Sequence, residues 1–87
     1  MKVVIIYRPA SEHSRVVDDF VHEFSRRHVG SHLELLNIDG REGSAMASLY
    51  DVTSYPAILA LRDDGSANMI WQGSSLPLID EVAGYAG

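Results

Sequence analysis

The sequence predicts an α/β domain in which helices cover both faces of a mixed four-stranded sheet, in the order β-α-β-α-β-β-α. Residues 3–7 form an unbroken β-branched and aromatic run, which is typical of a strand buried on both faces. Across residues 16–28, apolar side chains recur at helical spacing. Residues 57–61 and 67–72 are strand-like and flank an Asp63-Asp64-Gly65 turn, which predicts an antiparallel hairpin. Because strands joined through a helix run parallel and hairpin strands run antiparallel, the sheet must be mixed.

The first strand, residues 3–7, is predicted to be central, and Pro9 ends it because proline has no N–H to donate. The helix that follows has acidic residues early, Arg26-Arg27-His28 late and Gly30 just beyond its end. These positions match the helix dipole and a glycine stop. We expect Ser11 or Ser14 to cap this helix by accepting a hydrogen bond from one of its free backbone N–H groups.

Shorter patterns predict the remaining elements. Residues 33–39 alternate apolar and polar side chains, which indicates a second strand, parallel to the first and ended by Gly40. Residues 42–50 suit one short helix. After Ser74-Ser75, apolar side chains at every third position predict a last helix that ends near residues 84–87: Leu76, Ile79, Val82 and Tyr85.

Length, charge and composition exclude several classes of protein. The 87 residues support one domain, residues 1–87, with one core. The chain has no cysteine, which excludes disulfides, thiolate nucleophiles, iron–sulfur ligation and cysteine-based zinc sites. Seven basic and twelve acidic residues give a net charge of −5, so no nucleic-acid partner is expected. The apolar run of residues 3–6 is too short for a signal peptide or membrane span, so we expect a cytoplasmic protein with no membrane partner.

Two segments carry a resemblance to a known family. The first is Tyr7-Arg8-Pro9-Ala10-Ser11-Glu12-His13-Ser14-Arg15, between the first strand and the first helix, and the second is residues 49–61, with Tyr55-Pro56 near its centre. With the Asp63-Asp64-Gly65 turn and Gly73, they resemble the thioredoxin family at its shortest, glutaredoxin-like size, over residues 2–85. Ser11 and Ser14 stand where that family has the two cysteines of its Cys-x-x-Cys motif.

The resemblance implies a thioredoxin-like fold and a cis peptide bond between Tyr55 and Pro56. In the family, this proline lies against the active-site loop, and the backbone of the preceding residue pairs with an extended peptide or with glutathione. Here that residue is Tyr55, which is bulkier than the usual Thr, Val or Ile. The binding site that the resemblance implies is therefore a groove between the loop of residues 11–14 and Tyr55-Pro56.

The missing sulfurs decide between functions. A dithiol oxidoreductase needs a thiolate near neutral pH and a sulfur that forms and breaks S–S bonds, and a serine hydroxyl provides neither. Thioredoxins, unlike glutaredoxins, also place a buried carboxylate six residues before the first cysteine, and here that residue is Ile5. The preferred hypothesis is a redox-inactive thioredoxin-like domain that needs no cofactor and binds a peptide, a partner protein or a glutathione-like anion.

Two other hypotheses stay open. In the first hypothesis, the chain is a thiol-disulfide oxidoreductase of thioredoxin or glutaredoxin type whose active-site cysteines are replaced by serine, the nearest isostere of cysteine. Alternatively, it is a regulatory protein that acts by association, as the cysteine-free, thioredoxin-like KaiB clock proteins do. Residues 52–65 favour ordinary thioredoxins over that group.

The candidate binding residues come from the two segments of the resemblance: Arg8, Ser11, Glu12, His13, Ser14, Arg15, Tyr55 and Pro56. Arg8 and Arg15 bracket the loop, where a helix N-terminus favours an anion or a carboxylate. In the alternative interpretation, both arginines are solvated and pair with Glu12 or Asp18. Tyr55 is expected to point at the loop because it precedes Pro56.

Two kinds of catalytic site are disfavoured. A serine nucleophile needs a base within hydrogen-bond reach, and His13 lies only two residues from Ser11, which on a helix turns the ring to the side. Capping is therefore the favoured role for both serines. His28 and His32 are four residues apart but straddle the end of the predicted helix, and His22 lies six residues before His28, so none of them forms a helical zinc pair; we expect solvated or helix-end histidines and no metal.

Overall fold

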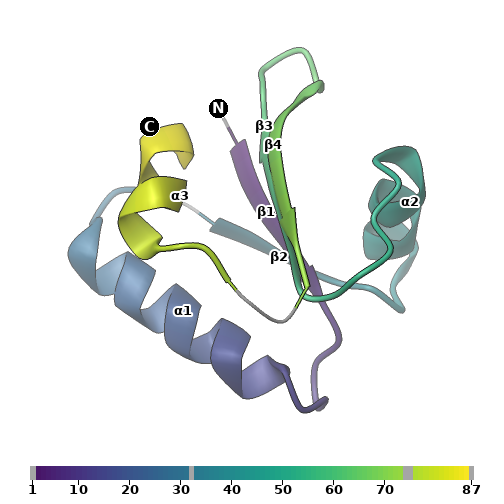
Figure 1. The fold of residues 1–87 in the computed structure, drawn as a ribbon, viewed down its shortest axis with the longest axis horizontal. Coiled ribbons are helices and arrows are strands. Elements are labelled where there is room, and N and C mark those ends of the chain that lie inside the picture. Colours follow the sequence, from purple (N-terminus) through teal and green to yellow (C-terminus); the bar gives the residue numbers. More distant parts are fainter. Residues whose placement is uncertain (1, 32, 74–75, 87) are drawn as a thin grey trace.

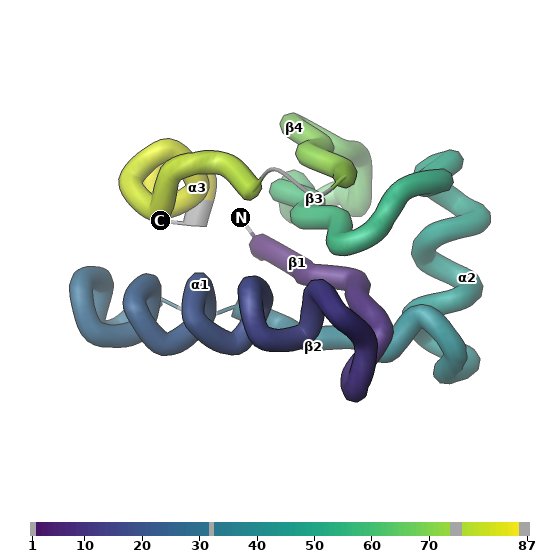
Figure 2. The backbone as a smooth tube through the Cα atoms, turned by 60° about the horizontal axis from the view of Figure 1, so that its bottom comes forward, coloured from purple at the N-terminus to yellow at the C-terminus, as the bar shows by residue number. Residues whose placement is uncertain are grey.

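The computed structural model describes residues 2–31, 33–73 and 76–86, and within them the predicted element order is confirmed. The elements are β1 (Lys2–Tyr7), α1 (Ser14–Arg27), β2 (Leu33–Asn37), α2 (Arg41–Leu49), β3 (Ala57–Leu61), β4 (Ala67–Gln72) and α3 (Ile79–Ala86). The sheet order is β2-β1-β3-β4. β1 is parallel to β2 and antiparallel to β3, and β3 is antiparallel to β4. α1 and α3 lie on one side of the sheet and α2 on the other (Figures 1 and 2).

The two central strands are buried on both faces, as their unbroken apolar runs predict. All five residues of β3 are buried, and so are the four residues 3–6 of β1. One cluster of buried side chains lies on the α1 and α3 face: Val3, Ile5, Val17, Phe20, Phe24, Ile58, Ala60 and Val82. A second lies on the α2 face: Val4, Ile6, Ala47, Val52, Ala57, Leu59 and Leu61. The sheet therefore separates two small cores.

α1 packs on the sheet through one apolar stripe. Val17, Phe20 and Phe24 are its buried residues, at the i, i+3 and i+7 positions of one helix face. On the exposed side, Glu23 accepts hydrogen bonds from Arg26 and Arg27 in the last turn. The Arg26 hydrogen bond, more than that of Arg27, lowers the pKa of the Glu23 carboxyl below its ordinary value.

β2 ends two residues earlier than the sequence predicted, at Asn37 instead of Asp39. The Asn37 side chain accepts a hydrogen bond from the Asp39 N–H at 2.9 Å, and the Asn37 carbonyl accepts one from the Gly40 N–H at 2.9 Å. These bonds turn the chain, because an asparagine side chain competes with the strand ladder for backbone N–H groups. α2 starts directly after this turn.

α2 approaches the end of β2 so closely that one of its positions accepts only glycine. A Cβ atom built on buried Gly43 would lie 2.1 Å from the Asn37 carbonyl oxygen and 2.8 Å from its carbonyl carbon. Both obstacles are backbone atoms, which cannot rotate away. Gly43 therefore sets the distance between α2 and the sheet.

The hairpin between β3 and β4 has the predicted turn. Gly65 adopts a φ of 90°, and the Arg62 N–H donates to the Ser66 carbonyl at 2.8 Å. Asp64 accepts hydrogen bonds from the hydroxyl and the backbone N–H of Ser66, and the hydroxyl bond in particular lowers the pKa of this carboxyl. An Asx-type turn followed by a left-handed glycine explains why the Asp-Asp-Gly string closes a hairpin.

α3 begins at Ile79, later than the pattern from Leu76 predicted. Pro77 restricts Leu76 to extended conformations, which explains the later start. Ser74-Ser75, predicted to precede the helix, lie outside the described residues. Val82 is fully buried, and the Tyr85 ring meets the Trp71 ring edge-on, with centroids 5.4 Å apart. None of the described helices has the length and apolarity needed to cross a membrane.

Candidate functional site

The two segments of the expected groove lie at one end of the sheet. β1 ends at Tyr7 and β3 begins at Ala57, and the two strands pair antiparallel with Ile6 opposite Ala57. The chain that leaves β1 and the chain that enters β3 are therefore adjacent (Figure 1). The peptide bond between Tyr55 and Pro56 is cis.

The loop of residues 8–14 is held by hydrogen bonds within itself. The Arg8 N–H donates to Nε2 of His13 at 3.1 Å, and the Ser11 hydroxyl donates to the Arg8 carbonyl. The Ser14 hydroxyl and the Ser14 N–H both donate to the Ser11 carbonyl, at 2.8 and 3.1 Å. Ala10 adopts a left-handed φ of 64°, which turns the chain between these bonds. The loop is thus a compact turn that leads directly into α1.

Neither serine caps α1 in the way the sequence predicted. The N-cap position is His13, and no side chain makes a cap hydrogen bond there. Ser14 is the first helical residue, one position too late to be the N-cap, and the hydroxyls of Ser11 and Ser14 donate to carbonyl groups instead of accepting from N–H groups. The capping prediction is wrong because the preceding turn delays the start of the helix.

His13 serves the backbone and does not activate Ser11. Because its Nε2 accepts the Arg8 N–H, this nitrogen has no proton in the observed arrangement and its lone pair is used. Within residues 2–31, 33–73 and 76–86, no hydrogen bond joins the His13 ring to a serine. A base oriented toward a serine nucleophile is therefore not assembled in the described part of the chain.

Arg8 pairs with Asp39, a partner that no sequence pattern had predicted. Its Nε and Nη2 atoms donate to the two carboxylate oxygens of Asp39, at 3.1 and 3.2 Å. Neither Glu12 nor Asp18 is its partner. Arg8 and Asp39 follow parallel neighbouring strands, and the carboxyl ends of such strands meet at one edge of a sheet, so the predicted parallel pairing could have suggested this contact.

Glu12 and Arg15 are exposed charges of the loop and first turn, as Arg8 is. No ion pair or hydrogen bond engages either side chain among the residues the structure describes. α1 also has no acidic residue in its first turn. No carboxylate in the first turn of α1 therefore compensates the positive end of the helix dipole.

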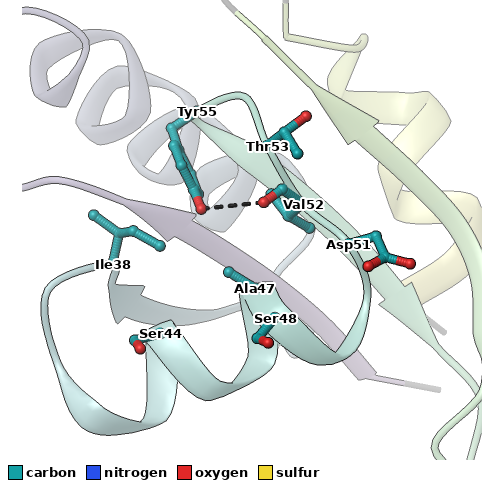
Figure 3. A pocket seen from close by; sticks show the side chains of 8 residues that line it. All are labelled: Ile38, Ser44, Ala47, Ser48, Asp51, Val52, Thr53 and Tyr55. Atoms are coloured by element: carbon teal, nitrogen blue, oxygen red, sulfur yellow. Dashed lines mark hydrogen bonds between the residues drawn. The ribbon is translucent and has the colours of Figure 1, made fainter.

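Tyr55 points away from the loop that it was expected to face. Its ring packs against the cluster on the α2 face, and its hydroxyl donates to the Val52 carbonyl at 3.3 Å (Figure 3). Pro56 is among the fully buried side chains, so its ring lines no open surface. The Tyr55 ring is instead partly buried against the apolar side chains of the α2 face, where burial of its apolar surface is favourable.

A cavity of about 400 Å³ opens beside Tyr55, and it is called the α2 cavity below (Figure 3). Its apolar lining comes from the β2–α2 turn, from α2 and from the segment after it: Ile38, Ala47 and Val52. Its polar lining consists of four hydroxyl residues and one carboxylate: Ser44, Ser48, Thr53, Tyr55 and Asp51. Sequence reasoning missed this cavity because short polar residues at a helix surface carry no signal of a hollow behind them.

Of the histidines outside the loop, only His28 has a hydrogen-bond partner among the described residues. His28 ends α1, and its Nε2 lies 3.0 Å from the Asp80 carboxylate of α3, which links the two helices. His22 is exposed, and His32 lies outside the described residues. Among the described histidines, aspartates and glutamates, no group of three or more could hold a metal ion.

Replacing His13 with alanine is expected to loosen the loop. The Arg8 N–H loses its acceptor, and one such bond contributes about 1 kcal/mol, equivalent to about a fivefold change in an opening equilibrium. Hydrogen exchange followed by NMR should therefore show a several-fold faster rate at the Arg8 amide. His22→Ala, at an exposed histidine of α1, is the control, and an unchanged Arg8 rate in His13→Ala contradicts the role assigned to the ring.

Comparison with known proteins relates this chain to thioredoxins through its fold. No family model matches the sequence, and no curated protein matches it. Oxidised mitochondrial thioredoxin 3 of Saccharomyces cerevisiae is similar, with a TM-score of 0.68 and 14% identity over 97% of this chain and 74% of that chain. The germline-specific thioredoxin Deadhead of Drosophila melanogaster gives a TM-score of 0.70 and 16% identity over 94% and 73%. Thioredoxin 1 of Thermosipho africanus has a TM-score of 0.66 and 12% sequence identity, and the match covers 98% of this chain and 89% of that chain. The chain therefore has a thioredoxin-like fold.

Proposed function

From a thioredoxin-like fold without cysteine, we propose that this protein is a redox-inactive domain that binds an extended peptide segment of a partner protein. The binding surface is the end of the sheet where the loop of residues 8–14 lies next to Tyr55-Pro56. The observation that carries the proposal is the β1–β3 register, with Ile6 opposite Ala57, because it makes these two segments neighbours.

The absent sulfur supports binding over thiol chemistry. The chain contains no cysteine, and the Ser11 and Ser14 hydroxyls each donate to a backbone carbonyl. A hydroxyl used in this way stabilises the loop and has no path to disulfide exchange. The loop of residues 8–14, which presents a reactive thiol in a thioredoxin, here forms one side of the binding surface.

Charge at the start of α1 suggests which peptide is bound. Arg8 is engaged by Asp39, which leaves Arg15 as the exposed cation of the first turn. The N-terminal N–H groups of α1 add partial positive charge at the same place. A peptide with a carboxylate beside its extended backbone fits this combination, and it fits even though the whole chain carries a net charge of −5.

Peptide selection followed by NMR tests the proposal. Peptides selected from a displayed random library are titrated into ¹⁵N-labelled protein, and we expect shifts at the amides of Glu12, His13 and Tyr55. Arg15→Ala should weaken binding about tenfold, as expected for a lost charge-assisted hydrogen bond. Arg41→Ala, at the first residue of α2, removes a matched charge and should leave binding unchanged. The proposal is wrong if no peptide is selected, or if the shifts bypass both segments.

A further inference from the structure

The α2 cavity combines an apolar floor with a rim that accepts hydrogen bonds. Ala47 and Val52 are buried, with exposures of 5% and 6%, so the floor belongs to the packed core and is fixed in place. In Figure 3, Ile38 and Tyr55 stand at one end of the cavity and Asp51 at the other, with Ala47 and Ser48 between them. A volume of about 400 Å³ is in the range of small-ligand sites.

The rim carries one formal charge, and it is negative. Asp51 is exposed, and no hydrogen bond or ion pair to its carboxylate occurs within the described part of the chain. No lysine, arginine or histidine lines the cavity, as far as the described residues extend. A ligand that enters this space therefore meets a carboxylate and several hydroxyl oxygens.

We propose that the α2 cavity binds the side chain of an arginine presented by a partner protein. A guanidinium has five N–H donors and no acceptor, which suits a rim that offers Asp51 together with the hydroxyls of Ser48 and Thr53. Its planar fork can donate two parallel hydrogen bonds to the Asp51 carboxylate. The aliphatic stem lies on Ile38, Ala47 and Val52, as arginine stems do on apolar surface.

The polar groups of this site are distinct from those of the peptide surface proposed above. The expected groove involves the loop before α1 at one end of the sheet, whereas the α2 cavity lies on the α2 face, and Tyr55 is the one residue common to both sets. Arginine binding at the cavity and peptide binding at the loop can therefore succeed or fail separately.

Three small probes test the assignment with the full chain at physiological salt. N-acetyl-L-arginine amide is titrated into ¹⁵N-labelled protein, with N-acetyl-L-citrulline amide as its neutral isostere and N-acetyl-L-lysine amide as the alternative cation. We expect saturable shifts at Ser48, Asp51 and Thr53 with the arginine probe, and about tenfold weaker binding of the citrulline probe. Equal binding of the citrulline or the lysine probe overturns the assignment to a guanidinium.

Two variants locate the binding. Asp51→Asn keeps the side-chain shape and tolerates the left-handed φ of 55° at this position, so it should fold and should bind the arginine probe about tenfold more weakly. Asp19→Asn, an exposed carboxylate on α1, is the matched control. Ser48→Leu fills the cavity without changing its charge and should abolish the shifts. If Asp51→Asn binds as the unmodified protein does, or if Ser48→Leu still binds, the proposal is wrong.

Discussion

Gly43→Ala is expected to lower the free energy of unfolding by about 3 kcal/mol, although alanine is the better helix former. The new Cβ would lie 2.1 Å from the Asn37 carbonyl oxygen, so α2 must move away from the end of β2. This movement opens the packing of Ala47 and Val52 against the sheet. Urea denaturation followed by circular dichroism measures the loss, and the midpoint should fall with little change in slope.

Gly84→Ala is the matched control for this prediction. Gly84 also lies within a helix, α3, but a Cβ atom built there meets nothing within 4 Å. The same substitution should therefore leave stability unchanged or raise it by up to about 1 kcal/mol, through helix propensity alone. Equal stability of the two variants would show that the close approach of α2 to Asn37 has no energetic consequence.

Phe24→Ala should cost about 3 to 5 kcal/mol, since the substitution leaves a cavity in the larger of the two cores. Phe24 is fully buried, and its ring centroid lies 6.3 Å from that of Phe20 and 5.3 Å from that of His28. A domain of this size has a total stability of about 4 to 13 kcal/mol, so the substitution removes a large share of it and should lower the melting temperature. Thermal denaturation by calorimetry measures the effect.

Phe24→Leu keeps the prediction testable if the alanine variant does not fold, and it should be destabilised by a smaller amount. Leu49→Ala is the control, because Leu49 ends α2 with 72% of its surface exposed, and its loss should change stability by less than about 0.5 kcal/mol. If Phe24→Ala lowers the free energy of unfolding no more than Leu49→Ala does, the burial of Phe24 does not hold α1 on the sheet.

The sequence was sufficient for the fold wherever one period dominates a segment. The apolar run of residues 3–7 and the i, i+3, i+7 stripe of α1 each allow one structure, because burial of one face or both faces follows directly from the spacing. The ends of the elements were harder to predict where a side chain competes with the regular backbone hydrogen bonds or restricts the backbone. Asn37 ends β2 early through its own amide, and Pro77 delays α3.

The candidate site was only partly predictable. The sequence indicated which two segments approach each other, but not the partners of their side chains. Arg8 reaches Asp39, 31 positions away in the chain, and His13 accepts the backbone N–H of Arg8. Tyr55 turns toward Val52 and the α2 face. These contacts depend on which rotamers the surrounding packing permits, and no local pattern encodes that choice.

By itself, therefore, the sequence determined the element order, the two-faced burial of the central strands and the absence of cysteine. These properties depend on residue type and on spacing within one segment. Only the tertiary structure decided that Gly43 must lack a side chain, that Arg8 forms an ion pair with Asp39 and that a hollow with a single carboxylate forms beside Tyr55. The physical reason is that these features depend on distances between segments, and such distances exist only after both helical layers have packed on the sheet.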